Sequence, residues 1–279
     1  MRVAVAQIRV ELGAPDRNFE NVQRWLSRAK DGGAELVVLP EMVDTGYRMD
    51  VVLAHACRWD DAGSFHARLR ALAAELEISV ACGLSERDGG GVHNAITVID
   101  GSGDPIARYR KSHLFPLADE HRALTPGEEI VVVDHGDLRF GLAVCYDLRF
   151  PDLFRQQMRA GAAAYLVPSA WPFPRLEHWK TLTASRAIEN QAYLVAANRV
   201  GADGPLVFCG SSRIVDPFGT VLASADEISE GVIAADIEPA RVEEVRTAMP
   251  FLSSERPELY ARPVRMARWG GEPKLTSGE

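Results

Sequence analysis

Cys145 is the residue of this chain best placed to act as a nucleophile. It follows an apolar run, residues 140–144, that is typical of a buried strand, and Pro151 is well placed to open a helix six residues later. The cysteine therefore falls on a tight strand-to-helix connection, where a side chain is held out of the core with backbone N–H groups beside it. This position suits a catalytic thiol, although an inert buried cysteine has the same pattern.

A glutamate and a lysine stand at comparable places in the chain. Glu41 follows a short apolar strand over residues 36–39, and Lys111 lies in the segment YRKSHLF. Side chains just past the carboxyl ends of neighbouring strands in an α/β sheet converge on one crevice, so these two residues could meet Cys145 there. Taken singly, a glutamate at a strand end and a lysine in a basic stretch are usually solvated surface charges.

The first half of the sequence predicts the elements that position these residues. Apolar spacing predicts a helix that is capped by Asp16 and ends at Gly32 and Gly33, and a second helix capped by Ser64. Strands are expected over residues 1–8, 36–39, 78–82 and 94–99. The glycine-rich residues 88–91 lack the phosphate-loop pattern and predict a hairpin turn. Residues 110–128 form a long irregular segment of the kind that is often functional.

The second half continues the alternation of strands and helices. Helices are expected from about residue 151 and over residues 174–190, with strands at 140–144, 163–167, 193–197, 212–215, 220–223 and 232–236. Mixed parallel and hairpin connections indicate an α/β fold with a mixed sheet in each half and helices outside. Because no composition shift marks a boundary, we expect a single domain over residues 1–279, with a polar tail from about residue 262.

Composition limits the class of protein. The 279 residues carry a net charge of −8 and no basic stripe, which argues against a nucleic-acid partner. No apolar stretch approaches the ~20 residues of a membrane span, and the first residues resemble a strand rather than a signal peptide, so we expect a cytoplasmic protein without a membrane partner. The four cysteines, Cys57, Cys82, Cys145 and Cys209, have neither zinc-like spacing nor the context of a disulfide framework.

Three segments together resemble the nitrilase superfamily of carbon–nitrogen hydrolases. LPEM contains Glu41, YRKSHLF contains Lys111 and AVCYDLRFP contains Cys145, and their order and separation match the family. The resemblance continues through VPSAWP, residues 167–172, and DPFG, residues 216–219, and covers residues 1 to about 260. It implies a four-layer α-β-β-α sandwich, a homodimer or higher homo-oligomer, and no metal or other cofactor.

The resemblance also implies catalytic roles. Cys145 is the nucleophile, Glu41 the general base, and Lys111 the cation that stabilises the oxyanion, with the backbone N–H of Tyr146 as second donor. A second glutamate follows the lysine in this family, and Glu120 is preferred for it over Glu128 and Glu129, because TPG at residues 125–127 looks like the family's turn segment. With a glutamate base, His113, His121 and His178 are interpreted as packing or hydrogen-bonding residues.

The expected substrates are a small-molecule amide and water, with release of ammonia. YDLRFP, ADEH at residues 118–121 and RAIEN at residues 186–190 look most like the omega-amidase-like branch, and SRIVDPFG at residues 212–219 also resembles the amidase of deaminated glutathione. Tyr146, Trp171 and Arg175 are the residues expected to contact the substrate. A substrate carboxylate needs a cation, for which we favour Arg175, close to Trp171, over Arg149, which we expect to pair with Asp147 or another buried acid. The alternatives are a nitrilase and a non-catalytic interaction module.

Overall fold

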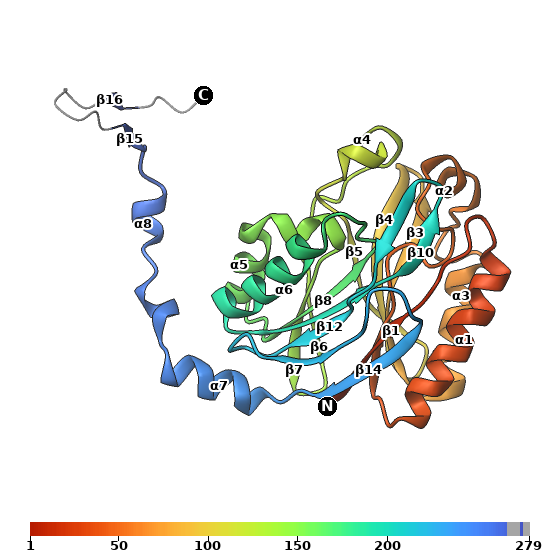
Figure 1. Cartoon of the computed structure of the whole chain (residues 1–279), viewed down its shortest axis with the longest axis horizontal. Helices are drawn as coiled ribbons and strands as arrows, with labels where there is room; N and C mark the ends of the chain where they lie inside the picture. The colour runs from red at the N-terminus through yellow and green to blue at the C-terminus, as the bar shows by residue number, and fades with distance from the viewer. Residues whose placement is uncertain (267–273, 276–279) are drawn as a thin grey trace.

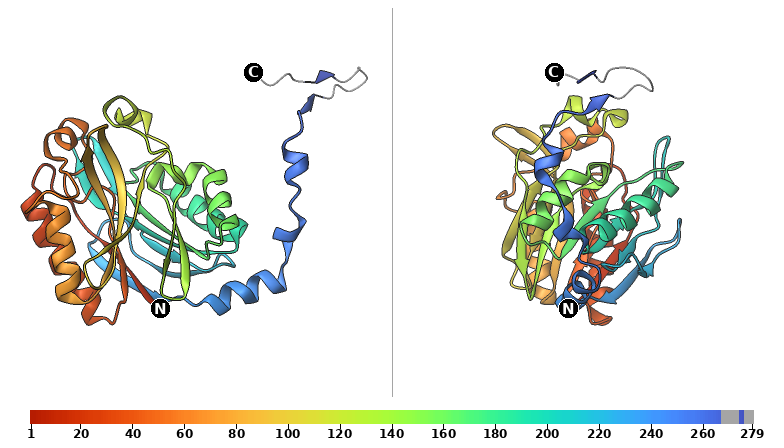
Figure 2. Two further views of the ribbon diagram at one scale, coloured as in Figure 1. Left: turned by 180° about the vertical axis from the view of Figure 1, so that it is seen from behind. Right: turned by 90° about the vertical axis from the view of Figure 1, so that its left-hand side faces the viewer.

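The computed structural model describes residues 1–266, 274 and 275, and it contains two six-stranded sheets packed face to face (Figure 1). The first sheet has the strand order β14-β1-β2-β3-β4-β5 and the second β13-β12-β9-β8-β7-β6. Helices α1 and α3 cover the outer face of the first sheet, and α5 and α6 cover that of the second (Figure 2). The predicted α-β-β-α sandwich is confirmed.

The first sheet is parallel at its centre and antiparallel at both sides. Strands β1 and β2 pair in parallel, as do β2 and β3, whereas β3–β4, β4–β5 and β1–β14 are antiparallel. The strands are β1 (Arg2–Gln7), β2 (Leu36–Val38), β3 (Ser79–Asp88), β4 (Gly91–Ile99), β5 (Pro105–Arg110) and β14 (Gly231–Asp236). Asp88 pairs with Gly91, which confirms the predicted hairpin turn.

The second sheet has the same plan. Strands β7, β8 and β9 are parallel neighbours, and β6 and β12 pair antiparallel at either side of them. The strands are β6 (Val132–His135), β7 (Leu138–Leu142), β8 (Ala164–Ser169), β9 (Tyr193–Asn198), β12 (Arg213–Val215) and β13 (Val221–Ser224). A separate ribbon, β10 (Val200–Asp203) and β11 (Leu206–Cys209), follows β9. The expectation of one sheet in each half was wrong in one respect, because β14 from the second half completes the first sheet along β1.

The helices follow the predicted amphipathic pattern. They are α1 (Pro15–Asp31), α2 (Met49–His55), α3 (Phe65–Leu76), α4 (Glu120–Ala123), α5 (Pro151–Arg159), α6 (Leu176–Asn190), α7 (Pro239–Ala248) and α8 (Pro257–Tyr260), with 3₁₀ turns η1 (Pro116–Ala118), η2 (Cys145–Arg149) and η3 (Phe251–Ser254). Ser64 accepts a hydrogen bond from the backbone N–H of Ala67 at 3.1 Å, which confirms that cap. The predicted Asp16 cap was wrong: Pro15, which lacks an N–H, opens α1 and places Asp16 in its first turn.

The core lies mainly between the two sheets. Val5, Val38 and Ile96 on the first sheet and Phe140 and Leu166 on the second belong to one buried apolar cluster. A second cluster joins the outer face of the first sheet to α1 and α3. Burial on both faces explains why the central strands are continuous apolar runs, as in other parallel sheets covered on both sides.

The last described part of the chain leaves this body as an arm. Helix α7 still packs against the body through buried Val242 and Val245, and Glu255, just after η3, pairs with Arg155 and Arg159 of α5. Beyond these contacts the arm continues through α8 to the short paired strands β15 (Arg265–Met266) and β16 (Lys274–Leu275) (Figures 1 and 2). The polar tail predicted from about residue 262 lies partly in residues 267–273 and 276–279, outside the described residues. Within the described part of the chain, no helix combines the length and apolar character of a membrane span.

Candidate active site

The sheets bring three distant loops together. Glu41 follows β2, Lys111 follows β5, and Cys145 lies just past β7, which ends at Leu142 rather than at Val144 as predicted. Cys145 therefore opens the turn η2 instead of ending a strand. The Asp147 carboxylate accepts a hydrogen bond from the backbone N–H of Val144 at 2.9 Å, which explains why the chain leaves the sheet there.

Lys111 is buried between two glutamates. Its Nζ lies 2.9 Å from Oε1 of Glu41 and 2.8 Å from Oε2 of Glu120, and all three side chains are fully buried. Burial alone would lower the pKa of Lys111, but the carboxylates of Glu120 and Glu41 outweigh it, and the pKa lies well above its ordinary value. Lys111 is therefore a permanent cation at the floor of the site.

Glu41 is fixed by three donors. Besides Lys111, the Asn94 side-chain amide donates to its Oε1 at 2.6 Å, and the backbone N–H of Ala170 donates to its Oε2 at 2.7 Å. Burial raises the pKa of Glu41, and the hydrogen bonds from Lys111 and Asn94 oppose the rise. A carboxylate with a raised pKa is suited to exchange protons near neutral pH.

A glycine on the neighbouring strand allows the Glu41 loop to lie against the sheet. A Cβ atom on Gly83, in β3, would stand 2.5 Å from the Cα of Glu41 and 2.6 Å from the carbonyl oxygen of Pro40. No side chain fits in that gap, because heavy atoms without a covalent or hydrogen bond do not approach so closely. Gly83 is thus required for the placement of Glu41, and this role was not predicted from the sequence.

Cys145 is held in an uncommon backbone conformation. Its φ of 47° lies in the left-handed region, which residues other than glycine rarely adopt and which is frequent at functional sites. Burial raises the pKa of the thiol well above its ordinary value, and the negative charge of the neighbouring Glu41 carboxylate adds to the rise. The side chain is therefore a neutral thiol in the free protein and needs a base to become a nucleophile.

Glu120 and not its sequence neighbours reaches Lys111. Besides its contacts with Lys111, Glu120 accepts hydrogen bonds from Asn94 and from the backbone N–H of Phe115, both at 2.6 Å. Glu128 and Glu129 are exposed on a different face, beside Arg108 and Arg110. The short helix α4 accounts for the difference, because it turns Glu120 inward.

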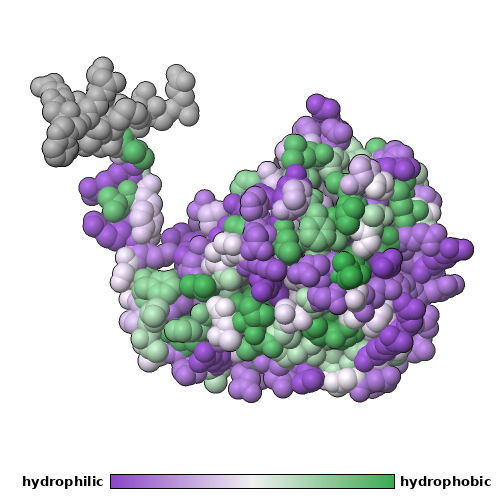
Figure 3. All heavy atoms as spheres, in the orientation of Figure 1, coloured by the Kyte–Doolittle hydropathy of each residue, from purple (hydrophilic) through white to green (hydrophobic). Residues whose placement is uncertain are grey.

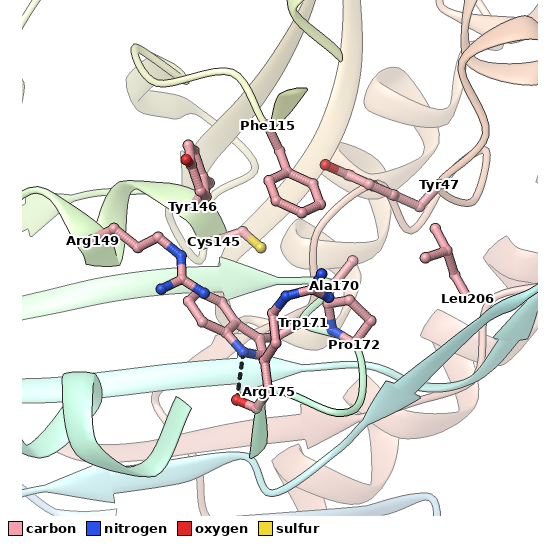
Figure 4. Close-up of a pocket in the computed structure, with 10 residues that line it drawn as sticks. All are labelled: Tyr47, Phe115, Cys145, Tyr146, Arg149, Ala170, Trp171, Pro172, Arg175 and Leu206. Atoms are coloured by element: carbon pink, nitrogen blue, oxygen red, sulfur yellow. Dashed lines mark hydrogen bonds between the residues drawn. The ribbon is translucent and has the colours of Figure 1, made fainter. Parts of the chain in front are cut away.

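A cavity opens over the thiol (Figure 4). The free space in and above it amounts to about 350 Å³ when the open solvent at its mouth is included. The residues that line it belong to loops after β2, β5, β7 and β8 and to β11, and they are Tyr47, Phe115, Cys145, Tyr146, Arg149, Ala170, Trp171, Pro172, Arg175 and Leu206. Three residues that we predicted to contact substrate, namely Tyr146, Trp171 and Arg175, therefore lie around the thiol.

The expected pairing of Arg149 with Asp147 was wrong. The Asp147 carboxylate instead accepts hydrogen bonds from the Tyr109 hydroxyl at 2.9 Å and from the backbone N–H of His113 at 3.1 Å. Arg149 turns into the cavity, where its guanidinium lies 4.7 Å from the centre of a Trp171 ring. Burial is the main cause that lowers the pKa of Arg149, and the positive charge of Arg175 adds to it.

The histidines and the other cysteines lie outside the charged cluster. The Nδ1 atom of His113 is 2.7 Å from Asp147, His178 contacts Arg149, and His121 is exposed. All four cysteines are free, and among the described residues no group of three or more His, Cys, Asp and Glu side chains is arranged to hold a metal ion.

Asn94 and Tyr47 are among the residues of the site that were not predicted from the sequence. Asn94 connects Glu41 and Glu120, and Tyr47 lines the cavity beside Cys145. Asn94 is followed in its strand by the mainly apolar residues 95–99, and an asparagine in such a position is a usable signal for a buried function. Tyr47 carries no such signal, because aromatic residues are common in cores.

Comparison with known proteins agrees with this geometry. The sequence profile described as "Carbon-nitrogen hydrolase" matches residues 2–247. The chain belongs to this family. Its members are enzymes, and buried Glu41, Lys111 and Cys145 have the residue types and the arrangement of the family's catalytic triad.

Relatives support the same membership over the whole body. The 2-oxoglutaramate amidase of Bacillus subtilis is 33% identical over 259 residues, which are 92% of this chain and 98% of that protein. The structure of XC1258 from Xanthomonas campestris, with an arsenic adduct in its active site, superimposes with a TM-score of 0.86 at 29% identity and covers 92% of this chain and 97% of that one. A mutant amidase from Nesterenkonia sp. AN1 in complex with butyramide gives a TM-score of 0.80 at 28% identity, with 90% and 95% covered.

Proposed function

We propose that this protein is an amidase that hydrolyses a small linear amide with a carboxylate group and releases ammonia. The observation that carries the proposal is the pair of arginines at the cavity. Within residues 1–264, neither Arg149 nor Arg175 forms an ion pair with a carboxylate, although both guanidinium groups line the space over the thiol. Two neighbouring cations without a counterion favour an anionic substrate.

The first half of the reaction forms a thioester. Glu41 accepts the proton of the Cys145 thiol, and the sulfur attacks the amide carbon. The oxyanion of the tetrahedral intermediate is stabilised by the Lys111 ammonium and the backbone N–H of Tyr146. Glu41 then passes its proton to the leaving nitrogen, the carbon–nitrogen bond breaks and ammonia departs.

The second half returns the free enzyme. Water loses a proton to Glu41 and attacks the thioester carbon, the carbon–sulfur bond breaks, and the proton returns to the Cys145 sulfur. The product is a carboxylic acid. Throughout both halves Glu120 holds Lys111 in place and keeps it charged, which follows from its 2.8 Å contact with Nζ.

The relatives narrow the choice of acyl group. A 2-oxoglutaramate amidase and an amidase that binds butyramide both act on, or hold, small linear amides. We propose an omega-amidase-like substrate, in which a short chain separates the amide from the carboxylate. Cys145 then attacks the amide end, while Arg175 binds the carboxylate and Arg149 adds a second positive charge.

A substrate panel tests the proposal. Ammonia release is measured from 2-oxoglutaramate, a deaminated-glutathione analogue, butyramide and a short aliphatic nitrile. We expect the highest kcat/KM for a carboxylate-bearing amide. The proposal would be contradicted if the nitrile were turned over faster than every amide. It would also be contradicted if butyramide were turned over faster than both carboxylate-bearing amides.

Arg175→Gln tests the carboxylate site itself. Loss of a charged hydrogen bond typically costs about 1.5–3 kcal/mol, so kcat/KM for the best carboxylate-bearing amide should fall about 10- to 100-fold. The value for butyramide should change less than about threefold, because that amide has no anionic group. Arg139→Gln, an exposed arginine that pairs with Asp134 far from the cavity, is the matched control. Equal losses of kcat/KM for both amides would show that Arg175 does not bind the substrate carboxylate.

We also propose that the protein is a cytoplasmic homodimer. The four free cysteines suit a reducing compartment. The arm exposes apolar side chains, including Phe251, Leu259 and Tyr260, and Figure 3 shows apolar residues on its surface. Light scattering on the full chain should give twice the mass of 30.5 kDa, and a monomer at micromolar concentration would contradict the proposal.

A further inference from the structure

The Tyr47 hydroxyl is a buried polar group without a hydrogen-bond partner within the described part of the chain. The residue is only 4% exposed, yet it lines the cavity that contains Cys145. In Figure 4 its hydroxyl points toward the same side of the cavity as Phe115. An unpaired buried hydroxyl costs about 1–3 kcal/mol, which a phenylalanine of the same shape would avoid. The oxygen atom therefore contributes nothing to the stability of the folded protein.

Tyr47 is held firmly in this position. Its backbone N–H donates to Oδ2 of Asp203 at 2.7 Å, and its ring packs edge-to-face on Phe208 with the centroids 6.5 Å apart. Asp203 is itself fixed by Arg199, whose Nη1 lies 2.6 Å from Oδ2. These contacts hold both the backbone and the ring of Tyr47 in place, so its hydroxyl points in a fixed direction.

The neighbours of Tyr47 are the groups that carry out the reaction. Nζ of Lys111 lies 5.8 Å from the centre of the Tyr47 ring. Burial raises the pKa of Tyr47 well above its ordinary value, and the negative charge of Glu120 adds to the rise. The phenol therefore remains protonated throughout the neutral range and is available as a hydrogen-bond donor.

We propose that Tyr47 is a further catalytic residue, whose hydroxyl donates a hydrogen bond to the oxygen of the amide under attack. This oxygen must lie near Lys111 when the carbon meets Cys145. Tyr47 lines the cavity that contains Cys145, and its ring lies beside the Nζ atom of Lys111. It would be the third donor to the oxyanion, beside the Lys111 ammonium and the Tyr146 backbone N–H. The inference rests on the proposed amidase function and adds a residue to it.

The test is Tyr47→Phe, which removes only the unpaired oxygen. Loss of one oxyanion donor costs about 10²-fold in turnover, so kcat for the best amide should fall 10- to 100-fold while KM stays within about threefold. The melting temperature should equal or exceed that of the wild type, because no hydrogen bond in the free protein is lost. A kcat within threefold of the wild type, or a change in KM alone, would overturn the proposal.

Tyr165→Phe is the matched control. The Tyr165 hydroxyl is also buried, but it donates to the carbonyl oxygen of Phe154 at 2.9 Å, away from the cavity. Its removal should lower the melting temperature and leave kcat unchanged. The two variants thus separate a hydroxyl that serves the fold from one that serves the reaction.

A second measurement keeps the inference testable if no amide of the panel is hydrolysed. Glu41 takes the thiol proton, and the Cys145 sulfur adds to the terminal carbon of acrylamide, which places negative charge on the amide oxygen until Glu41 passes the proton to the α-carbon. The sulfur displaces iodide from iodoacetamide without charge on that oxygen. Mass spectrometry gives both rates of adduct formation on Cys145. Tyr47→Phe should lower the acrylamide rate at least about tenfold relative to the iodoacetamide rate, and an unchanged ratio would overturn the role of Tyr47.

Discussion

Two of the buried groups of opposite charge in the described part of the chain are built differently. Beside β10, Arg199 faces Asp203 alone, with Nη1–Oδ2 at 2.6 Å and Nη2–Oδ1 at 3.0 Å, and its Nη2 also donates to the carbonyl oxygen of Val10. Beside Cys145, the single ammonium of Lys111 faces both Glu41 and Glu120. The first group is balanced in charge, whereas the second has one carboxylate in excess.

This difference in charge balance gives the first group a structural role and the second group a chemical role. A balanced, bidentate pair has both charges satisfied, so it holds Tyr47 and the β10–β11 ribbon in place and exchanges no proton. An excess carboxylate in a buried site has a raised pKa, so it accepts and returns protons during a reaction. We therefore expect substitutions in the two groups to have opposite consequences.

Glu41→Gln should give the largest effect on activity. The amide cannot accept the proton of Cys145, and loss of a general base lowers kcat about 10³-fold. Stability should be unchanged or higher, because Lys111 keeps Glu120 as its partner and the excess negative charge disappears. Ammonia release and thermal unfolding measure the two quantities. A marked loss of stability would show that Glu41 is a structural partner of Lys111.

Asp203→Asn should have the reverse result. It leaves the buried Arg199 guanidinium without its counterion, which costs about 3–5 kcal/mol of unfolding free energy in denaturant titrations. The double variant Arg199→Met with Asp203→Leu is the control, and it should recover much of that loss because no charge remains buried. If Asp203→Asn alone were as stable as the wild type, the proposed difference between the two groups would be wrong.

Asn94→Ala should have a smaller effect that is visible in the pH profile. The Asn94 amide stabilises the ionised form of Glu41, so its removal raises the pKa of that carboxyl. Glu41 acts as a base only when ionised, so activity is lost as pH falls through this pKa. The acid limb of kcat/KM, which reports the ionisation of Glu41, should therefore move to higher pH.

Asn190→Ala provides the matched control for this profile. Asn190 is another fully buried asparagine, but its side-chain amide donates to the carbonyl oxygen of Arg186 within α6. The variant should lose stability and keep the acid limb of the wild type. An equal displacement of the limb in both variants would mean that Asn94 acts through general destabilisation.

The predictable part of the fold was the part with strong periodicity. Helix α1 and strands β2, β8 and β9 were predicted within a few residues, because burial on one helix face or on both strand faces requires a regular apolar pattern. Short elements such as α2 and β10 were missed, since their few residues carry little pattern. The place of β14 beside β1 was also missed, because pairing between the ends of a chain leaves no local signal.

The sequence by itself determined the family and the types of the reacting groups, because LPEM, YRKSHLF and AVCYDLRFP bring a carboxylate, an ammonium and a thiol in a specific order. Only the tertiary structure decided that Glu120 reaches Lys111, that Arg149 turns toward the cavity, and that the Tyr47 hydroxyl has no partner. Those outcomes depend on how loops from both sheets pack against one another. Residue types are local to the sequence, whereas the satisfaction of a buried charge or hydroxyl depends on atoms contributed from across the fold.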